Sequence, residues 1–301
     1  MHCVTVPQGF RRPTSVPDLL DRMSAMVTAE GAQAALDYQA SPTDVFVVTP
    51  AKCGTTWMQQ IVHGLRTRGS MDFENINDVI PWLQLAYDSG QDLRAPQGAR
   101  PHAFKTHSEL DAVPEGGRYI VVVRDPSDAL LSYYRFAEGA FFESGSIDVE
   151  TFARELFLPR AALNGHILAS WPRRNDSDVL MLCFENIKAD LPGTVQRVAE
   201  FLDVPLDAEL LEIVVRQSDI GFMKQHESKF DDLALFESFR HRMRLPPTAS
   251  MSKVRDGSVG ASTVGIPDSI RQELAEAWTA EVTPATGLAT YEDLRLALVA
   301  G

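Results

Sequence analysis

One short segment, Thr49-Pro-Ala-Lys-Cys-Gly-Thr-Thr-Trp57, gathers residue types that bind anions. It follows an apolar run and precedes a helical pattern, so we predict a strand-to-helix turn. The backbone N–H groups and the helix dipole at such a turn favour an anion. Lys52 adds a positive charge, Gly54 permits close backbone approach, and Thr55 and Thr56 add hydroxyl donors. These features predict a phosphate-binding loop.

The same segment has other interpretations. It is not the Walker pattern, in which two glycines flank four residues before Lys and Ser or Thr, because here Lys52 precedes a single glycine. An ordinary turn with a threonine cap is one alternative. A nucleophilic Cys53 is another, although a lone cysteine without an identified histidine partner is more often inert.

A second segment, Arg124-Asp-Pro-Ser-Asp128, also follows an apolar run. We expect Ser127 or Asp128 to cap the helix that begins there. Ser132 lies about one and a half turns beyond the cap. A guanidinium and a hydroxyl that face one point suit a phosphate held at two edges. A structural salt bridge of Arg124 is the alternative.

The elements that position these residues follow from the apolar pattern. Residues 44–49, 118–124 and 178–184 are nearly continuous apolar runs, which is typical of strands buried on both faces of a parallel sheet. Two sets of apolar residues fall on helical faces: Trp57, Met58, Ile61, Val62 and Leu65, and Val195, Val198, Ala199 and Leu202. The sequence therefore predicts a three-layer α/β/α fold with a mostly parallel central sheet, whose ligands bind beyond the carboxyl ends of the strands.

Length and composition agree with such a fold. The chain has 301 residues, of which 45% are hydrophobic, and no long linker, so we predict one domain over residues 1–301. Residues 245 to 265 combine prolines, glycines and basic residues, which favours a loop that covers a ligand.

Net charge and cysteine content exclude several classes of protein. A net charge of −13 argues against wholesale binding to nucleic acid or anionic membranes but permits a local basic pocket. Cys3, Cys53 and Cys183 are too few and too scattered for a disulfide framework or a zinc cluster. There is neither an apolar run of about 18 residues nor a secretory signal pattern, so the expectation is a soluble cytoplasmic protein.

Together the two segments resemble the cytosolic sulfotransferase family, whose donor is 3′-phosphoadenosine 5′-phosphosulfate. The family signature Tyr-Pro-Lys-Ser-Gly-Thr-Thr-Trp matches the first segment, with one extra residue after the proline and Cys53 in place of serine. The second signature is similar to residues 124–136, including the spacing from arginine to serine. The resemblance implies that Arg124 and Ser132 hold the 3′-phosphate and that Trp57 stacks near the adenine. It implies contacts to the 5′-phosphosulfate from Lys52, Cys53, Gly54, Thr55, Thr56 and Trp57.

Weaker matches extend the resemblance, which covers about residues 40 to 280. Residues 255–260 are similar to the family's Arg-Lys-Gly-x-x-Gly, but Asp256 replaces the lysine, and an acid beside a phosphate is unfavourable. Phe184-Glu-Asn-Ile-Lys188 resembles the family's Tyr-Glu-Asp-Met-Lys without the tyrosine hydroxyl. The resemblance implies further donor contacts from Phe184, Ser218, Arg255 and Gly257.

Phe104-Lys-Thr-His107 lies between the two anion-binding segments and matches the family's Lys-Thr-His. Sulfuryl transfer is an in-line displacement, for which an enzyme positions the reactants, stabilises charge and removes the acceptor proton. A histidine, with an ordinary pKa of about 6.5, suits the base. The interpretation assigns His107 as base, Lys52 to the bridging oxygen and Lys105 to the sulfuryl oxygens, with no metal required. Alternatively, His107 is only a polar residue at a strand end.

The acceptor site is less constrained. The candidates to line it are aromatic, although aromatic residues at helical spacing are often core: Trp82, Phe136, Phe141, Phe142, Phe236 and Phe239. This composition favours a small lipophilic or phenolic hydroxyl over a sugar. The family's carboxyl-terminal dimerisation pattern is not recognisable, so the acceptor's identity and the oligomeric state stay open.

Two other functions compete with a sulfotransferase that releases adenosine 3′,5′-bisphosphate (PAP). One is a nucleotide-binding module that has lost turnover, which the departures at Cys53, Phe184 and Asp256 keep open. The other is a metal-dependent kinase with an atypical phosphate loop, for which Asp125 is the obvious metal candidate.

Overall fold

A parallel sheet forms the centre of the computed structural model, which describes residues 10–159, 162–247, 251, 253, 259–260 and 265–300. Its strands are β1 (Val45–Val48), β2 (Ala103–Thr106), β3 (Arg118–Val123) and β4 (Val179–Cys183), in the order β2-β1-β3-β4. All neighbouring pairs are parallel. The three predicted strands are confirmed. Strand β2 was not predicted, because two of its four residues are polar and no continuous apolar run marks it.

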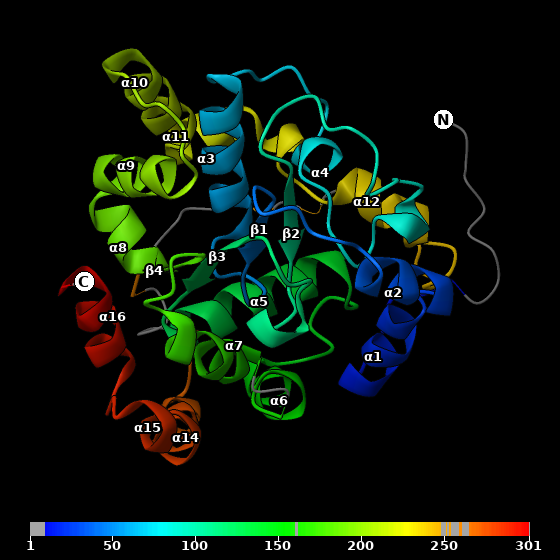
Figure 1. The fold of residues 1–301 in the computed structure, drawn as a ribbon. Coiled ribbons are helices and arrows are strands. Elements are labelled where there is room, and N and C mark those ends of the chain that lie inside the picture. The colour runs from blue at the N-terminus through cyan, green and yellow to red at the C-terminus, as the bar shows by residue number, and fades with distance from the viewer. Residues whose placement is uncertain are drawn as a thin grey trace.

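Helices cover both faces of this sheet (Figure 1). Val45 and Val47 of β1 pack into the cluster of α3 (Thr55–Thr67), α9 (Leu191–Phe201) and α10 (Ala208–Gln217). Phe46 and Val48 face the opposite cluster, which includes residues of α7 (Ala162–Ser170), α16 (Tyr291–Ala300) and the start of α5 (Pro126–Ala140). Successive side chains of a strand point to opposite faces, so one short strand serves both cores. The predicted three-layer α/β/α fold is confirmed.

The remaining elements connect and extend these layers. They are α1 (Val16–Ser24), α2 (Ala29–Leu36), α4 (Ile76–Val79), η1 (Tyr87–Ser89), η2 (Leu110–Ala112), α6 (Val149–Phe152), η3 (Ala153–Phe157), η4 (Trp171–Arg173), α8 (Phe184–Ala189), α11 (Ile220–Gln225), η5 (Glu227–Lys229), α12 (Leu233–Phe239), α14 (Asp268–Ala277), η6 (Trp278–Val282) and α15 (Thr283–Thr286). A further apolar cluster joins α1, α5, α12 and α14. Within the described ranges, no helix is both long and apolar enough to span a membrane.

The sheet topology explains where a ligand can bind. Strands β1 and β3 are neighbours, yet α3 leaves β1 toward one face and α5 leaves β3 toward the other. A crevice opens at the carboxyl edge where adjacent connections diverge in this way. Thr49, His107, Arg124 and Phe184 each directly follow the end of one strand. The predicted segments therefore converge on one edge of the sheet.

Candidate active site

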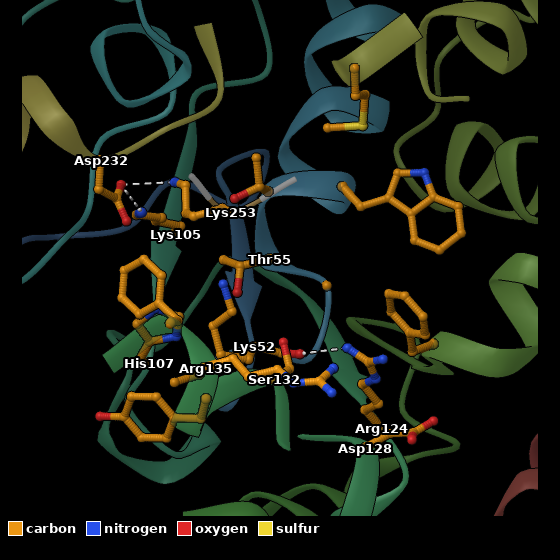
Figure 2. A pocket seen from close by; sticks show the side chains of 18 of the residues that line it. Lys52, Thr55, Lys105, His107, Arg124, Asp128, Ser132, Arg135, Asp232 and Lys253 are labelled. Carbon is orange, nitrogen blue, oxygen red and sulfur yellow. Dashed lines mark hydrogen bonds and ion pairs between the residues drawn. The ribbon is translucent and has the colours of Figure 1, made fainter. Parts of the chain in front are cut away.

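A cavity of about 630 Å³ lies at this carboxyl edge and collects most of the predicted site residues (Figure 2). Those that line it are Lys52, Gly54, Thr55, Thr56, Trp57, Trp82, Lys105, His107, Arg124, Ser132, Phe136, Phe141, Phe184, Ser218 and Phe236. Cys53 and Phe142 do not line it. Arg255, Asp256 and Gly257 lie outside the described residues. Four separate strand ends therefore contribute to a single cavity.

The first loop turns sharply before α3. Lys52 has a φ of 67° and Gly54 a φ of 105°, both in the left-handed region. Gly54 is the N-cap and makes no side-chain cap hydrogen bond, and among the described residues no threonine caps the first N–H groups of α3, so the threonine-capped alternative is wrong. Thr55 instead lies 2.5 Å from Thr49, hydroxyl to hydroxyl. Uncapped N–H groups on a left-handed turn make a concave site for an anion.

Cys53 faces the core and not the cavity. It is fully buried beside residues of the sheet, and burial raises the pKa of its thiol. Its Sγ lies 3.8 Å from the Ala51 carbonyl oxygen. A buried thiol with a raised pKa is a poor nucleophile, so the structure gives no support to a reactive cysteine. A contact of Cys53 with the 5′-phosphosulfate, which the family resemblance implies, would therefore come from its backbone.

The second loop begins α5 with a cap that differs from the expected one. The side chain of Asp125 accepts hydrogen bonds from the backbone N–H groups of Ser127 (2.9 Å) and Asp128 (3.0 Å). Ser127 and Asp128 are therefore capped residues, and the prediction that one of them is the cap is wrong. Pro126 occupies the first helical position, which suits its fixed φ and missing N–H.

Arg124 joins the two loops. Its guanidinium is largely buried and donates to the Lys52 carbonyl oxygen at 3.2 Å. It also lies over the Phe184 ring, 4.2 Å from the ring centre. Ser132, two turns along α5, lines the same cavity. The structure thus brings the predicted 3′-phosphate residues to one side of the cavity.

The carboxyl-terminal helix braces this second loop, which the sequence did not reveal. Glu185 accepts the Asp125 backbone N–H at 3.1 Å on one oxygen and the Tyr291 hydroxyl at 2.5 Å on the other. Burial raises the pKa of Glu185. Because Tyr291 is 106 residues away from Glu185, no local pattern could have indicated the contact.

An aromatic corner closes one end of the cavity. Trp57 and Phe184 meet edge to face at 5.2 Å, and the Trp57 indole donates to the Ser218 carbonyl oxygen at 2.8 Å. The Ser218 hydroxyl is buried and has no hydrogen-bond partner among the described residues. Aromatic walls with a buried hydroxyl that still lacks a partner fit a flat heterocycle that offers hydrogen-bonding groups.

His107 has a defined orientation. Its Nδ1 lies 2.8 Å from the Thr49 carbonyl oxygen, and a carbonyl can only accept, so Nδ1 carries the proton and Nε2 carries the lone pair. Burial and the nearby Lys105 charge lower the pKa of His107 to about 3, so His107 is neutral at physiological pH. A second histidine, His166, which the sequence did not suggest, lies with its Nε2 3.2 Å from the His107 carbonyl oxygen.

Lys105 lies in an ion-pair cluster. Its ammonium is 3.5 Å from Asp232 and 4.5 Å from the centre of the Trp82 ring. Lys253 also binds Asp232, at 2.8 Å, and Figure 2 shows both lysines directed toward this carboxylate. Burial lowers the pKa of Lys105 to about 7 despite Asp232. Asp232 and Lys253 were missed because they belong to separate segments with no mutual spacing signal.

The acceptor side is aromatic. Lys52 lies over the Phe136 ring at 4.3 Å, and Trp82 meets His107 edge to face at 4.7 Å. Phe142 is fully buried and packs toward Phe152, whereas its neighbour Phe141 lines the cavity. The chain leaves α5 after Ala140, so these two phenylalanines point to different sides.

Several other cavity residues were not predicted. They include Met23, Asp128, Tyr133, Arg135, Lys188 and Asp219. Arg135 comes three residues after Ser132, so helical spacing could have placed it on the same face. Within the described part of the chain, no group of three or more His, Cys, Asp or Glu residues is placed to hold a metal ion.

Known proteins resemble this chain in sequence. Residues 42–261 match the family model described as the sulfotransferase domain. Sulfotransferase 1B1 of Mus musculus is 25% identical over 205 residues, which cover 63% of this chain and 68% of that protein. Amine sulfotransferase of Oryctolagus cuniculus is 26% identical over 197 residues, covering 62% and 65%. Luciferin sulfotransferase of Photinus pyralis is 25% identical over 241 residues, covering 68% and 63%.

Solved structures share the fold. A mouse sulfotransferase in complex with PAP superimposes with a TM-score of 0.65 at 20% identity, covering 86% of this chain and 91% of that one. Retinol dehydratase in a complex with retinol and PAP gives a TM-score of 0.66 at 18% identity, covering 90% and 96%.

Proposed function

We propose, since the chain belongs to the sulfotransferase family, that it transfers a sulfuryl group from 3′-phosphoadenosine 5′-phosphosulfate to the hydroxyl of a small acceptor. One observation carries this proposal. His107, with its lone pair on Nε2, lines the same cavity as the anion-binding loop at Lys52 and the guanidinium of Arg124. A base and two anion sites in one cavity are what an in-line transfer between a nucleotide and a hydroxyl requires.

The donor would lie across both loops. The left-handed turn at residues 52–54 and the uncapped start of α3 suit the 5′-phosphosulfate. Arg124 and Ser132 suit the 3′-phosphate, because a guanidinium and a hydroxyl bind two edges of one anion. The corner of Trp57 and Phe184, with the Ser218 hydroxyl, suits the adenine. We expect Arg255 and Gly257 to add contacts that the described residues do not include.

The proposed chemistry uses three side chains. His107 Nε2 takes the proton from the acceptor hydroxyl as its oxygen forms a bond to the sulfur. The bond from sulfur to the bridging oxygen breaks at the same time, and Lys52 stabilises the charge that develops on that oxygen. Lys105 offers a charge to the sulfuryl oxygens if it moves from Asp232. The products are a sulfate ester, PAP and one proton.

The acceptor would bind against the aromatic wall. Trp82, which meets His107 edge to face, lines the cavity together with Phe136, Phe141 and Phe236. Flat apolar side chains of this kind favour a lipophilic or phenolic hydroxyl.

Nucleotide binding and product detection test the proposal. Without Mg²⁺, we expect calorimetry to show that PAP binds much more tightly than adenosine 5′-monophosphate, and that Arg124→Ala removes most of this difference. Mass spectrometry of a mixed hydroxyl library incubated with donor should reveal products that carry an added sulfuryl group. Binding that ignores the 3′-phosphate would contradict the donor assignment. Normal PAP binding without any sulfated product would favour a module that binds nucleotide without turnover.

A further inference from the structure

The cluster of Lys105, Asp232 and Lys253 forms a wall of the cavity beside the proposed base. Lys105 and Asp232 are almost completely buried, at 2% and 5% exposure, and the Lys253 side chain is 10% exposed. Both ammonium groups contact the same carboxylate oxygen of Asp232, at 3.5 Å and 2.8 Å. The Asn77 amide donates to that oxygen as well, at 2.9 Å. All three charged residues line the cavity.

Among the described residues, two ammonium groups contact a single carboxylate in this cluster, that of Asp232. The Asp231 carboxylate also attracts Lys253, but from a longer distance. The adjacent Asp231 does not line the cavity, and one of its oxygens accepts the Leu233 backbone N–H at 3.1 Å. A buried charge that lacks a full counterion is costly, because desolvation is not compensated. Burial indeed lowers the pKa of Lys105 despite the nearby carboxylate.

The geometry connects this cluster to the reaction centre. The Trp82 ring lies 4.7 Å from the His107 ring, centre to centre, and 4.5 Å from the Lys105 ammonium. Trp82 therefore packs against both the proposed base and the lysine–carboxylate cluster, which are neighbours in the cavity wall. Polar residues such as Tyr133 and Arg135 also line the cavity. The lysine cluster is the one connected to the proposed base through Trp82.

We propose that Lys253, held in place by Asp232, forms a subsite for an anionic group of the acceptor, so that the preferred acceptor is an aromatic hydroxy acid, with a carboxylate at Lys253 and its hydroxyl at His107. Lys105 keeps its assigned place at the sulfuryl oxygens. This inference rests on the proposed function, because it assumes that the cavity holds a hydroxyl acceptor. A carboxylate there would complete the ion pairing, and charge-assisted hydrogen bonds in a dry site are stronger than neutral ones.

Asp232 holds the two ammonium groups in place. Although burial alone would raise the pKa of Asp232, Lys105 and Lys253 together hold it well below its ordinary value, so it stays ionised. A cationic acceptor would need Asp232 for itself and would meet both lysines, so the subsite disfavours amines.

Matched acceptors test the subsite in the wild-type protein. The probes are 3-(4-hydroxyphenyl)propionate, its methyl ester and tyramine, each assayed for kcat/KM with saturating donor. We expect the acid to exceed the ester by about tenfold or more, as a charge-assisted hydrogen bond provides, and tyramine to be the poorest. A preference for the ester or for tyramine would overturn the proposal.

A substitution at Lys253 tests the residues themselves. Lys253→Met should bring the acid-to-ester ratio of kcat/KM close to one, even if kcat/KM for the ester also changes, and Lys253→Arg should restore most of the preference. Equal losses for acid and ester in Lys253→Met would contradict the subsite, because they indicate a general role in transfer or folding. If Lys253→Met does not fold, the wild-type comparison still decides.

Binding without turnover separates this proposal from the proposed function. Calorimetry on the PAP-bound protein should show 3-phenylpropionate binding about tenfold more tightly than 3-phenylpropionamide. Neither ligand has a hydroxyl, so this result does not depend on catalysis. Equal binding of the two would refute the subsite even if sulfation of neutral phenols is robust. PAP that fails to bind would instead refute the proposed function.

Discussion

At the scale of single residues, the state of His107 matters most. The Thr49 carbonyl oxygen fixes the proton on Nδ1, and burial beside Lys105 keeps the ring neutral. A neutral imidazole with Nε2 toward a cavity can accept a proton without first losing one. Its lowered pKa makes the ring a weak base, but the negative charges of a bound donor would favour the imidazolium and raise its pKa.

We predict that His107→Ala lowers the rate of sulfuryl transfer by about 10²- to 10⁴-fold, as expected for loss of a general base. The affinity for PAP should stay within about twofold, because His107 lies on the acceptor side. Single-turnover assays and calorimetry measure the two effects. Parallel loss of PAP affinity would show that His107 is structural.

The pH profile gives a second prediction for His107. Because the pKa of His107 in the free protein is about 3, kcat/KM for the donor should not fall with a midpoint near the ordinary histidine value of about 6.5. The acid limb of kcat should lie at higher pH than that of kcat/KM, since the bound donor raises the pKa. Steady-state assays from pH 5 to pH 8 measure both, and an acid midpoint near 6.5 in kcat/KM would contradict the assignment.

At the scale of elements, the turn between β1 and α3 determines how closely the backbone at Gly54 can approach the sulfuryl donor. A side chain at Gly54 would be strained at its φ of 105°, and a Cβ there would lie 3.0 Å from a Phe184 ring carbon. Arg124 stacks on that same ring. The turn, the aromatic corner and the guanidinium are therefore packed as one unit.

We predict that Gly54→Ala destabilises the protein by about 1–3 kcal/mol, the usual cost of such backbone strain, and also weakens PAP binding. The matched control is Gly90→Ala, because Gly90 has a φ of 80° but nothing within 4 Å of its added Cβ. Thermal unfolding and calorimetry compare the two variants. If both lose PAP affinity equally, close packing at the turn is not required for the donor.

The brace from α16 can be tested in the same way. Tyr291→Phe removes the hydroxyl that donates to Glu185, which holds the Asp125 N–H at the second loop. We predict a loss of about 0.5–1.5 kcal/mol in the free energy of unfolding and weaker binding of PAP but not of adenosine 5′-monophosphate. Tyr87→Phe is the control, since Tyr87 is 53% exposed. Equal binding of PAP by wild type and Tyr291→Phe would show that the brace is only structural.

At the scale of the whole molecule, much of the fold could be predicted because buried parallel strands have a distinctive apolar pattern. Residues 118–123 illustrate this, whereas β2 was hidden by Lys105 and Thr106, which are buried but polar. Motif spacing placed Arg124 and Ser132 in the cavity. It could not place Lys253 against Asp232, nor Tyr291 against Glu185, because those pairs depend on how distant segments pack.

Three buried histidines, His63, His107 and His166, connect the fold to pH. Burial lowers their pKa values to about 4, 3 and 4, whereas an unfolded histidine titrates near 6.5. Between about pH 6.5 and 4 the unfolded chain therefore binds more protons than the folded one, and the free energy of unfolding falls as the pH falls. Three buried carboxyl groups have the opposite effect on the free energy of unfolding, because burial raises the pKa values of Asp125, Glu185 and Asp231. They limit the loss of stability at the acid end of the range.

We predict that urea unfolding shows a continuous loss of stability from pH 7 to pH 5, at up to about 1.4 kcal/mol per pH unit for each histidine. His63 packs against Phe73 and does not line the cavity, so His63→Gln should reduce this slope without changing PAP binding. The exposed His241→Gln is the control for the loss of a histidine. Stability that stays constant over this range would mean that the three rings are solvated, and it would remove the case for a neutral His107 as well.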